Sequence, residues 1–254
     1  MRIWIVQKKS LLFLLCLICP LAWGDGRSAG QLSEIHSRSQ LMCASAMVYF
    51  NPAERTPDPR GLNATFEHLN MMEAYMVQLG QPEALAQPLR AMKEVFETLD
   101  RLPPAERERY PALIQQMLGH QQRLQQAASA AYASAGPDLV AADLWAQSQA
   151  LATLLLDYQV RLYPLPQKVG LTLTPAQAKE LDQTIEQRFE TLLARHVEHA
   201  EVLSKAKASY LFVRPQLQRV ASGGNAGSSG AEFYLNRASV DLDELAVAVL
   251  TPSP

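Results

Sequence analysis

Two histidines set three positions apart are the residues best suited to metal chemistry. His196 and His199 lie in a predicted helix, where residues three apart share a face, so both imidazoles could reach one ion. Zinc usually needs a third protein ligand of definite placement, and the sequence offers no second cluster of such residues. Together with Glu198 and Glu201, the pair is more typical of a solvated helix face. We therefore expect no metal site here.

A single arginine stands on the apolar face of the first predicted helix. Arg38 must reach water, a carboxylate or a bound anion if that helix is buried. In a counterpart 109 residues later, Gln147 takes the place of Arg38 and Gln149 that of Gln40. If the two helices face each other, these side chains and Trp145 surround a small polar ligand-binding cavity. Alternatively, Arg38 extends to solvent at the edge of the bundle.

That counterpart belongs to a faint internal repeat. Seven identities relate residues 39–76 to residues 148–185, where about two or three are expected by chance. The repeat predicts two related helical units, residues 25–135 and 136–250, with residues 251–254 as a disordered tail. Two helices of similar composition are the alternative explanation.

The N-terminus has the pattern of an export signal. Three basic residues among the first nine precede the apolar run Leu11–Leu21, and small residues follow at Ala22 and Gly24. This order predicts a signal peptide over residues 1–24 that is cleaved on export. The run is shorter than the roughly 20 apolar residues that span a bilayer, so we expect no stable membrane insertion after cleavage. The expected location is the periplasm, and secretion is the alternative.

Composition points to a helical protein. Hydrophobic residues make up 48% of the 254 residues, while Gly numbers 12 and aromatic residues 7%. Beyond the leader, 20 basic and 25 acidic residues remain, so the net charge of −5 gives no basis for nucleic-acid binding. Cys43 is the one cysteine outside the leader, which excludes an intramolecular disulfide in the exported chain.

Apolar residues at helical spacing, separated by Pro- and Gly-rich breaks, predict an all-α bundle of about six or seven helices. Thr174, Pro175 and Gln177 form a capping box that opens a long helix, which is expected to run toward Tyr210. Val197 and Val202 are counted on the inner face of that helix, and Pro215 limits its regular part. The predicted helices cover approximately residues 28–50, 62–79, 85–99, 105–134, 139–162, 175–212 and 231–250.

The stretch around Arg38 resembles the first helix of the periplasmic sensor module of type IV pilus methyl-accepting chemotaxis transducers and nitrate-type sensors. The signature of that helix is approximately Ala-Gly-Arg-Gln-Arg-Met-Leu-Ser-Gln. Arg38 matches the first arginine and Leu41-Met42 the Met-Leu pair, whereas Ser37 replaces the glycine and Gln40 the second arginine. Residues 210–217, Tyr-Leu-Phe-Val-Arg-Pro-Gln-Leu, are similar to a segment of stand-alone periplasmic relatives. The resemblance implies a helical bundle that senses a ligand.

Three functions follow from these observations. The first is a non-catalytic periplasmic bundle that binds a small polar ligand or relays a signal to an envelope or inner-membrane partner. The second is a structural adaptor or chaperone of an envelope complex that presents a helix-lined groove. The third is a metal-dependent enzyme using His196 and His199. The sequence shows no catalytic motif and indicates no cofactor.

Overall fold

The structure is a computed structural model that describes residues 22–54, 56–136, 139–224 and 229–250. In these ranges the regular elements are eight α-helices and two short 3-10 helices, which confirms the predicted all-α bundle with one helix more than expected. The α-helices are α1 (Ala22–Tyr49), α2 (Pro59–Gln78), α3 (Glu83–Arg101), α4 (Tyr110–Ser134), α5 (Leu139–Leu162), α6 (Pro175–Arg195), α7 (Ala200–Ala221) and α8 (Ser229–Leu250). The 3-10 helices are η2 (Pro104–Arg109) and η3 (Val197–His199).

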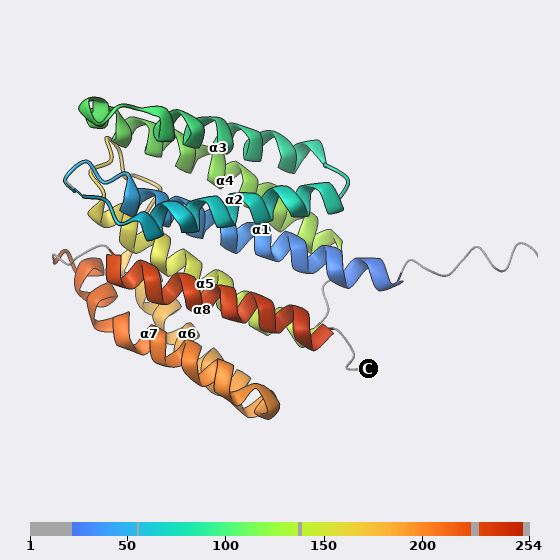
Figure 1. The fold of residues 1–254 in the computed structure, drawn as a ribbon. Coiled ribbons are helices and arrows are strands. Elements are labelled where there is room, and N and C mark those ends of the chain that lie inside the picture. Colours follow the sequence, from blue (N-terminus) through green and yellow to red (C-terminus); the bar gives the residue numbers. More distant parts are fainter. Residues whose placement is uncertain (1–21, 55, 137–138, 225–228, 251–254) are drawn as a thin grey trace, which may run out of the picture.

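The helices stack in successive layers (Figure 1). Helices α3 and α4 lie at one end of the stack and α6 and α7 at the other, with α1, α2, α5 and α8 between them. Helices α1–α4 form one group and α5–α8 a second, and the two groups make matching contacts. In the first group α1 packs on α2 and α4, and α3 packs on α4. In the second group α5 packs on α6 and α8, and α7 packs on α8. Contacts of α1 with α5 and α8 join the groups.

Each group of four helices has its own hydrophobic core. Met72, Phe96 and Met117 belong to the first core, and Trp145 and Phe189 to the second. The central helices supply both cores: α1 contributes Leu41 and Ala44 to the second, and α5 contributes Val160 to the first, with Tyr163 directly after its end. Helix α1 is therefore enclosed by packing on nearly every side.

Local sequence signals account for several helix ends. Helix α6 begins with the predicted capping box, in which the Thr174 hydroxyl accepts from the Gln177 amide at 3.2 Å. Helix α2 begins with a proline after Asp58, whose side chain accepts from the amide of Arg60. The break near Gly136 has a positive φ of 63°, which suits glycine, and the predicted boundary between the units lies between α4 and α5.

The long helix predicted from Thr174 toward Tyr210 is wrong. The chain leaves the helix at His196 (φ −115°, ψ 61°), passes through η3 and returns as α7. A continuous helix over residues 175–212 would extend roughly 55 Å. Folding back lets the apolar faces of α6 and α7 cover one core, whereas Val197 at the turn is 70% exposed and Val202 is 36% exposed. Helix α7 also continues past Pro215 to Ala221.

The predicted leader falls almost wholly outside the described residues, as does the predicted tail, residues 251–254. Among the described helices, none is both long and apolar enough to cross a membrane.

The close approach of α1 and α5 at Gly30 gives a stability prediction. A Cβ at Gly30 would lie 2.6 Å from Cζ2 of Trp145, a ring that is only 1% exposed. Gly30→Ala should therefore lower the free energy of unfolding by about 1–2 kcal/mol, because overpacking exceeds the gain in helix propensity. Gly119→Ala is the control in α4, where a Cβ meets nothing within 4 Å, and it should be neutral or stabilising by up to about 1 kcal/mol. Urea unfolding of both variants measures the difference, and equal effects would contradict the tight contact.

Candidate functional site

Helix α1 carries an unusual number of buried polar side chains for a central helix. Most of its residues from Ala29 to Phe50 are buried. The buried polar and charged residues of this stretch are Gln31, Ser33, Glu34, Ser37, Arg38, Ser39, Gln40 and Ser45. Because buried polar groups are costly unless they are hydrogen-bonded, their partners on α2, α5 and α8 determine how the bundle packs.

Arg38 lies in a buried ionic cluster between α1, α2 and α8. Its Nε donates to Glu34 Oε2 at 3.1 Å, and the Tyr75 hydroxyl of α2 donates to the same oxygen at 2.5 Å. From α8, Asp243 Oδ2 accepts a bond from the Ser37 hydroxyl at 3.0 Å. Arg38 and Glu34 are each 4% exposed and Asp243 is 1% exposed. Arg38 therefore lies beside carboxylates. This was one of the three partners expected for it, and it does not extend to solvent.

The charges of this cluster act on one another. The pKa of Asp243 is raised to about 7, chiefly by burial and also by the nearby Glu34, while Arg38 and the hydroxyls of Ser148 and Ser37 oppose the rise. Burial alone would lower the pKa of Arg38, but Asp243 and Glu34 raise it above its ordinary value. Arg38 therefore keeps its charge, and the carboxyl group of Asp243 titrates in the neutral range.

A second chain of hydrogen bonds continues along the contact between α1 and α8. The Ser45 hydroxyl donates to Glu232 Oε1 at 2.6 Å, and Asn236 Nδ2 donates to the same oxygen at 3.1 Å. His68 of α2 bonds through Nε2 to Asn236 Oδ1 at 3.0 Å. Burial, with a contribution from Arg38, lowers the pKa of His68 to about 3, so its imidazole is neutral. Hydrogen bonds between buried polar side chains thus join α8 to α1 and α2.

The five residues predicted to surround a cavity do not share one site. Gln40 bonds to Thr153 at 3.1 Å across the contact between α1 and α5, and Gln149 bonds to Ser33 at 2.7 Å across the same contact. Gln147 points to α6 instead and donates to the carbonyl of Ile185 at 3.0 Å.

The other two predicted residues also point elsewhere. Trp145 packs against Gly30 and, edge to face, against Tyr132. Arg38 faces α2 and α8. Positions two apart on a helix differ by about 200°, so Arg38 and Gln40 cannot both face α5. The same spacing separates Gln147 from Gln149.

A groove bordered by α5, α6 and α7 forms a hollow open to solvent. Its volume is about 550 Å³, within the range of roughly 300–1,000 Å³ common for small-molecule sites. Leu154, Ala178 and Leu217 supply apolar wall, while Lys179 and Gln183 are exposed at its edge. We call this hollow the α6–α7 groove.

A saturated ionic network forms one wall of the α6–α7 groove. Arg214 of α7 forks onto Asp182, with Nη2 to Oδ2 at 2.8 Å, and onto Glu186, with Nη2 to Oε2 at 3.0 Å. Asp182 also accepts from the hydroxyl of Tyr210 and from Gln218 Nε2. Burial alone would raise the pKa of Asp182, but Arg214 and Tyr210 hold it below its ordinary value. Asp182 is therefore ionised at neutral pH and is held by three donor side chains.

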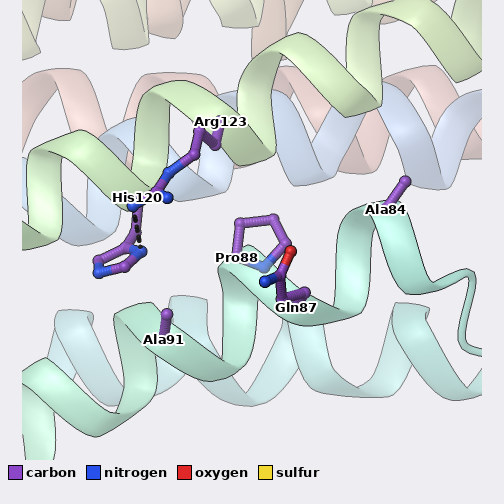
Figure 2. A pocket seen from close by; sticks show the side chains of 6 residues that line it. All are labelled: Ala84, Gln87, Pro88, Ala91, His120 and Arg123. Atoms are coloured by element: carbon purple, nitrogen blue, oxygen red, sulfur yellow. Dashed lines mark hydrogen bonds between the residues drawn. The ribbon is translucent and has the colours of Figure 1, made fainter.

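A smaller pocket lies between α3 and α4 (Figure 2). Its volume is about 110 Å³, below the range usual for a small-molecule site. His120 and Arg123 border it from α4, where Arg123 Nη2 donates to His120 Nδ1 at 2.8 Å. The α3 side is formed by Ala84, Gln87, Pro88 and Ala91. The α6–α7 groove is the better candidate for a binding site.

His196 and His199 do not lie on a continuous α-helix as predicted, because both belong to the turn between α6 and α7. His196 is 4% exposed and ends α6, while His199 closes η3 before α7. The described residues contain no group of three or more His, Cys, Asp or Glu placed to hold a metal ion. Cys43 is a free thiol whose pKa burial raises strongly, so it is protonated at neutral pH.

No family model matches this chain, and neither a curated protein nor a solved structure is similar enough to be matched to it. The function is therefore inferred from the geometry of the described residues.

Some residues of the two ionic networks could be partly anticipated from the sequence. Glu34 precedes Arg38 by four positions, the spacing of a helical ion pair. Arg214 stands within the segment noted for its resemblance to periplasmic relatives, but no role was assigned to it. Asp182 and Asp243 lie 32 or more positions from their basic partners, and only the tertiary structure brings them together.

The ionic wall of the groove gives a second prediction. Arg214→Met leaves Asp182 partly buried without its cation, so the free energy of unfolding should fall by about 1–3 kcal/mol at pH 7. Arg101→Met is the control, because Arg101 is 76% exposed and its pair with Glu97 should contribute under about 0.5 kcal/mol. Denaturant unfolding of both variants measures this contrast.

The pH dependence of Arg214→Met provides a separate check. Asp182 has a lowered pKa in the folded protein, so its stabilisation is present above the unfolded pKa and is lost as pH falls through the folded pKa. The deficit of Arg214→Met should therefore shrink in acid, below about pH 4. A deficit as small as that of Arg101→Met, or one that does not change with pH, would contradict this role for Arg214.

Proposed function

We propose that this chain is a non-catalytic helical-bundle binding protein that holds a small, partly apolar ligand in the α6–α7 groove. The observation that carries the proposal is the 550 Å³ hollow, with apolar wall and polar edge, beside a network of charged residues. Binding sites typically combine an apolar lining with a few placed polar groups.

The groove wall supports binding rather than reaction. Arg214, Asp182 and Glu186 neutralise much of one another's charge, and Tyr210 donates its hydroxyl to Asp182. These groups hold α6 and α7 in place and give the wall a fixed polarity. An occupant would place its apolar part against Leu154 and Leu217, with its polar end near the edge of the groove.

The proposal places the ligand in the α6–α7 groove and not between α1 and α5, where the sequence analysis expected it. Gln40 and Gln149 already bond to Thr153 and Ser33, and the residues of that contact are closely packed. The α6–α7 groove is instead lined by exposed residues such as Lys179 and Gln183, so a ligand could enter directly from solvent.

We further propose that the protein works in the bacterial periplasm and relays ligand binding to an envelope partner. The leader pattern of residues 1–24 supports export, and the resemblance around Arg38 supports a sensor-type bundle. Helix α7 lines the groove with Leu217 and Gln218 and packs on α8 along another face. A ligand that moves α7 would therefore act on α8 as well.

An exposed aromatic surface favours the second candidate function, a structural adaptor. Phe212 is 69%, Phe233 48% and Leu211 41% exposed. Tyr234 joins them, with ring centroids 4.8 Å from Phe212 and 5.3 Å from Phe233. Large exposed apolar side chains gathered in one place often mark a protein-interaction surface. Phe212, Phe233 and Tyr234 are the aromatic surface of α7 and α8.

The groove proposal is tested by thermal unfolding of the purified protein against amino acids and small amphipathic carboxylates and amines. A ligand at a hundredfold excess over its Kd should stabilise the native state by about 2.7 kcal/mol and raise the Tm in a concentration-dependent way. Gln183→Trp should abolish the rise by filling the groove, since Gln183 lines it from an exposed position. Gln187→Trp, one turn further along α6 and outside the lining, should retain it.

Two results would contradict binding in the α6–α7 groove. One is a panel that leaves the Tm of the cooperatively folded wild-type protein unchanged. The other is a ligand whose effect survives Gln183→Trp as fully as Gln187→Trp.

The adaptor candidate is tested on the aromatic surface. Phe212→Asp should remove an envelope protein that co-purifies stoichiometrically with the wild-type chain, because it places a charge at the centre of the apolar contact. Val77→Asp on α2 is the control, since Val77 is 66% exposed but lies outside the aromatic surface. Equal retention of the partner by both variants in a quantitative pull-down would eliminate the aromatic surface as its binding site.

A further inference from the structure

The buried cluster around Arg38 contains more acid than base. Glu34 and Asp243 are two carboxyl groups, and Arg38 is the guanidinium that faces both. All three are at most 4% exposed, so water contributes little to their solvation. With both acids ionised, the cluster would hold a net negative charge in a region of low polarity, which is unfavourable by several kcal/mol for an ion in a protein interior.

The hydrogen bonds show which acid is better placed to be neutral. Glu34 Oε2 accepts from Arg38 Nε and from the Tyr75 hydroxyl, so its negative charge has two donors. Asp243 Oδ2 accepts from Ser37, whereas its Oδ1, like Nη1 of Arg38, has no hydrogen-bond partner within the described chain. An unpartnered oxygen is less costly on a neutral carboxyl group than on a carboxylate.

We propose that this cluster is a proton-binding site, in which Asp243 carries the proton and loss of the proton weakens the packing of α8 against α1. Deprotonation leaves a second buried carboxylate beside Glu34, and the two repel each other across the contact between the helices. The cluster thereby couples the pH of the surroundings to the contact between α1 and α8, one of the two that join the groups of four helices.

The groups that face Asp243 come from several elements. Helix α1 contributes the charges of Glu34 and Arg38 and the hydroxyl of Ser37, α2 contributes Tyr75, and α5 contributes the hydroxyl of Ser148. His68 of α2 lies near Arg38 but stays neutral, because its pKa is lowered to about 3. Helix α7 places Lys205 against Asp241 of α8, at 3.9 Å.

The direction of the pH effect follows from the raised pKa of Asp243, about 7 against an ordinary value of 3.8. Between these values the folded state holds a proton that the unfolded state releases. Stability is therefore greatest at the acid end of this window and falls as pH rises toward 7. The unfolding equilibrium constant should increase by up to about tenfold per pH unit across the window and level off above it.

The test is urea unfolding of the full-length purified protein from pH 5 to pH 9. The unfolding equilibrium constant of wild type should rise up to about pH 7. Asp243→Asn should remove this rise, and its side-chain carbonyl oxygen can still accept the hydrogen bond from Ser37. Glu34→Gln should reduce the rise and move it to lower pH, because Asp243 stays buried but then faces Arg38 without a competing carboxylate. Asp241→Asn is the matched control: Asp241 lies two residues away on α8 and pairs with Arg237 at 2.8 Å, so the rise should remain.

Infrared spectroscopy of the folded proteins gives a readout that does not depend on variant stability. Wild type should show a protonated-carboxyl band at pH 5 that disappears with a midpoint near pH 7, and this titration should be absent in Asp243→Asn. The proposal is overturned if wild type shows no such titration, or if its unfolding profile matches that of Asp243→Asn throughout the pH range.

Discussion

The structure depends on solving one electrostatic problem, the burial of charged side chains on a helix with almost no exposed face. Arg38 and Glu34 lie one turn apart on α1, and each is 4% exposed. Neither could remain charged in that position without partners, because isolated ions are strongly disfavoured in a protein interior. Tyr75 from α2 and Asp243 from α8 supply the remaining polar surroundings. The placement of α2 and α8 on α1 is therefore tied to these side chains, and a slip of either helix by one turn would break the bond of Tyr75 to Glu34 or that of Ser37 to Asp243.

The two groups of four helices are consequently joined in two different ways. Across α1 and α5 the contact is mixed, with apolar residues shared between the two cores and the amides of Gln40 and Gln149 bridging to hydroxyl groups. Across α1 and α8 buried polar side chains form hydrogen bonds, from Asp243 at one end to Glu232 at the other. Apolar contacts tolerate small shifts, whereas buried hydrogen bonds require a definite register. We infer that the contact with α8 fixes how the halves align and that the cores supply most of the stability.

The sequence predicted the helices well and their contacts poorly, for physical reasons. Apolar spacing and proline breaks are local, so six of the seven predicted ranges correspond to single helices, and the capping box at Thr174 is correct. The seventh range failed because its turn at His196 contains neither Gly nor Pro and forms when two apolar faces meet one core. Alternate positions on a helix differ by about 200°, so Arg38 and Gln40 face different neighbours, as do Gln147 and Gln149. The partners Asp243 and Asp182 depend on long-range packing.

Helix α7 connects the features on which a binding function would rest. Leu217 and Gln218 line the α6–α7 groove, Arg214 and Tyr210 hold Asp182 of α6, and Phe212 lies on the exposed aromatic surface against Tyr234 of α8. A ligand shifts such an assembly only if it binds two arrangements of the helices with different affinity. The Arg214 network resists separation of α6 and α7, so an occupant of the groove would more readily tilt both helices together than open them. Such a tilt would be taken up where α7 meets α8, beside the aromatic surface. The same helix α8 carries Asp243 on its opposite connection to α1, so ligand binding and proton binding would act on α8 from different sides.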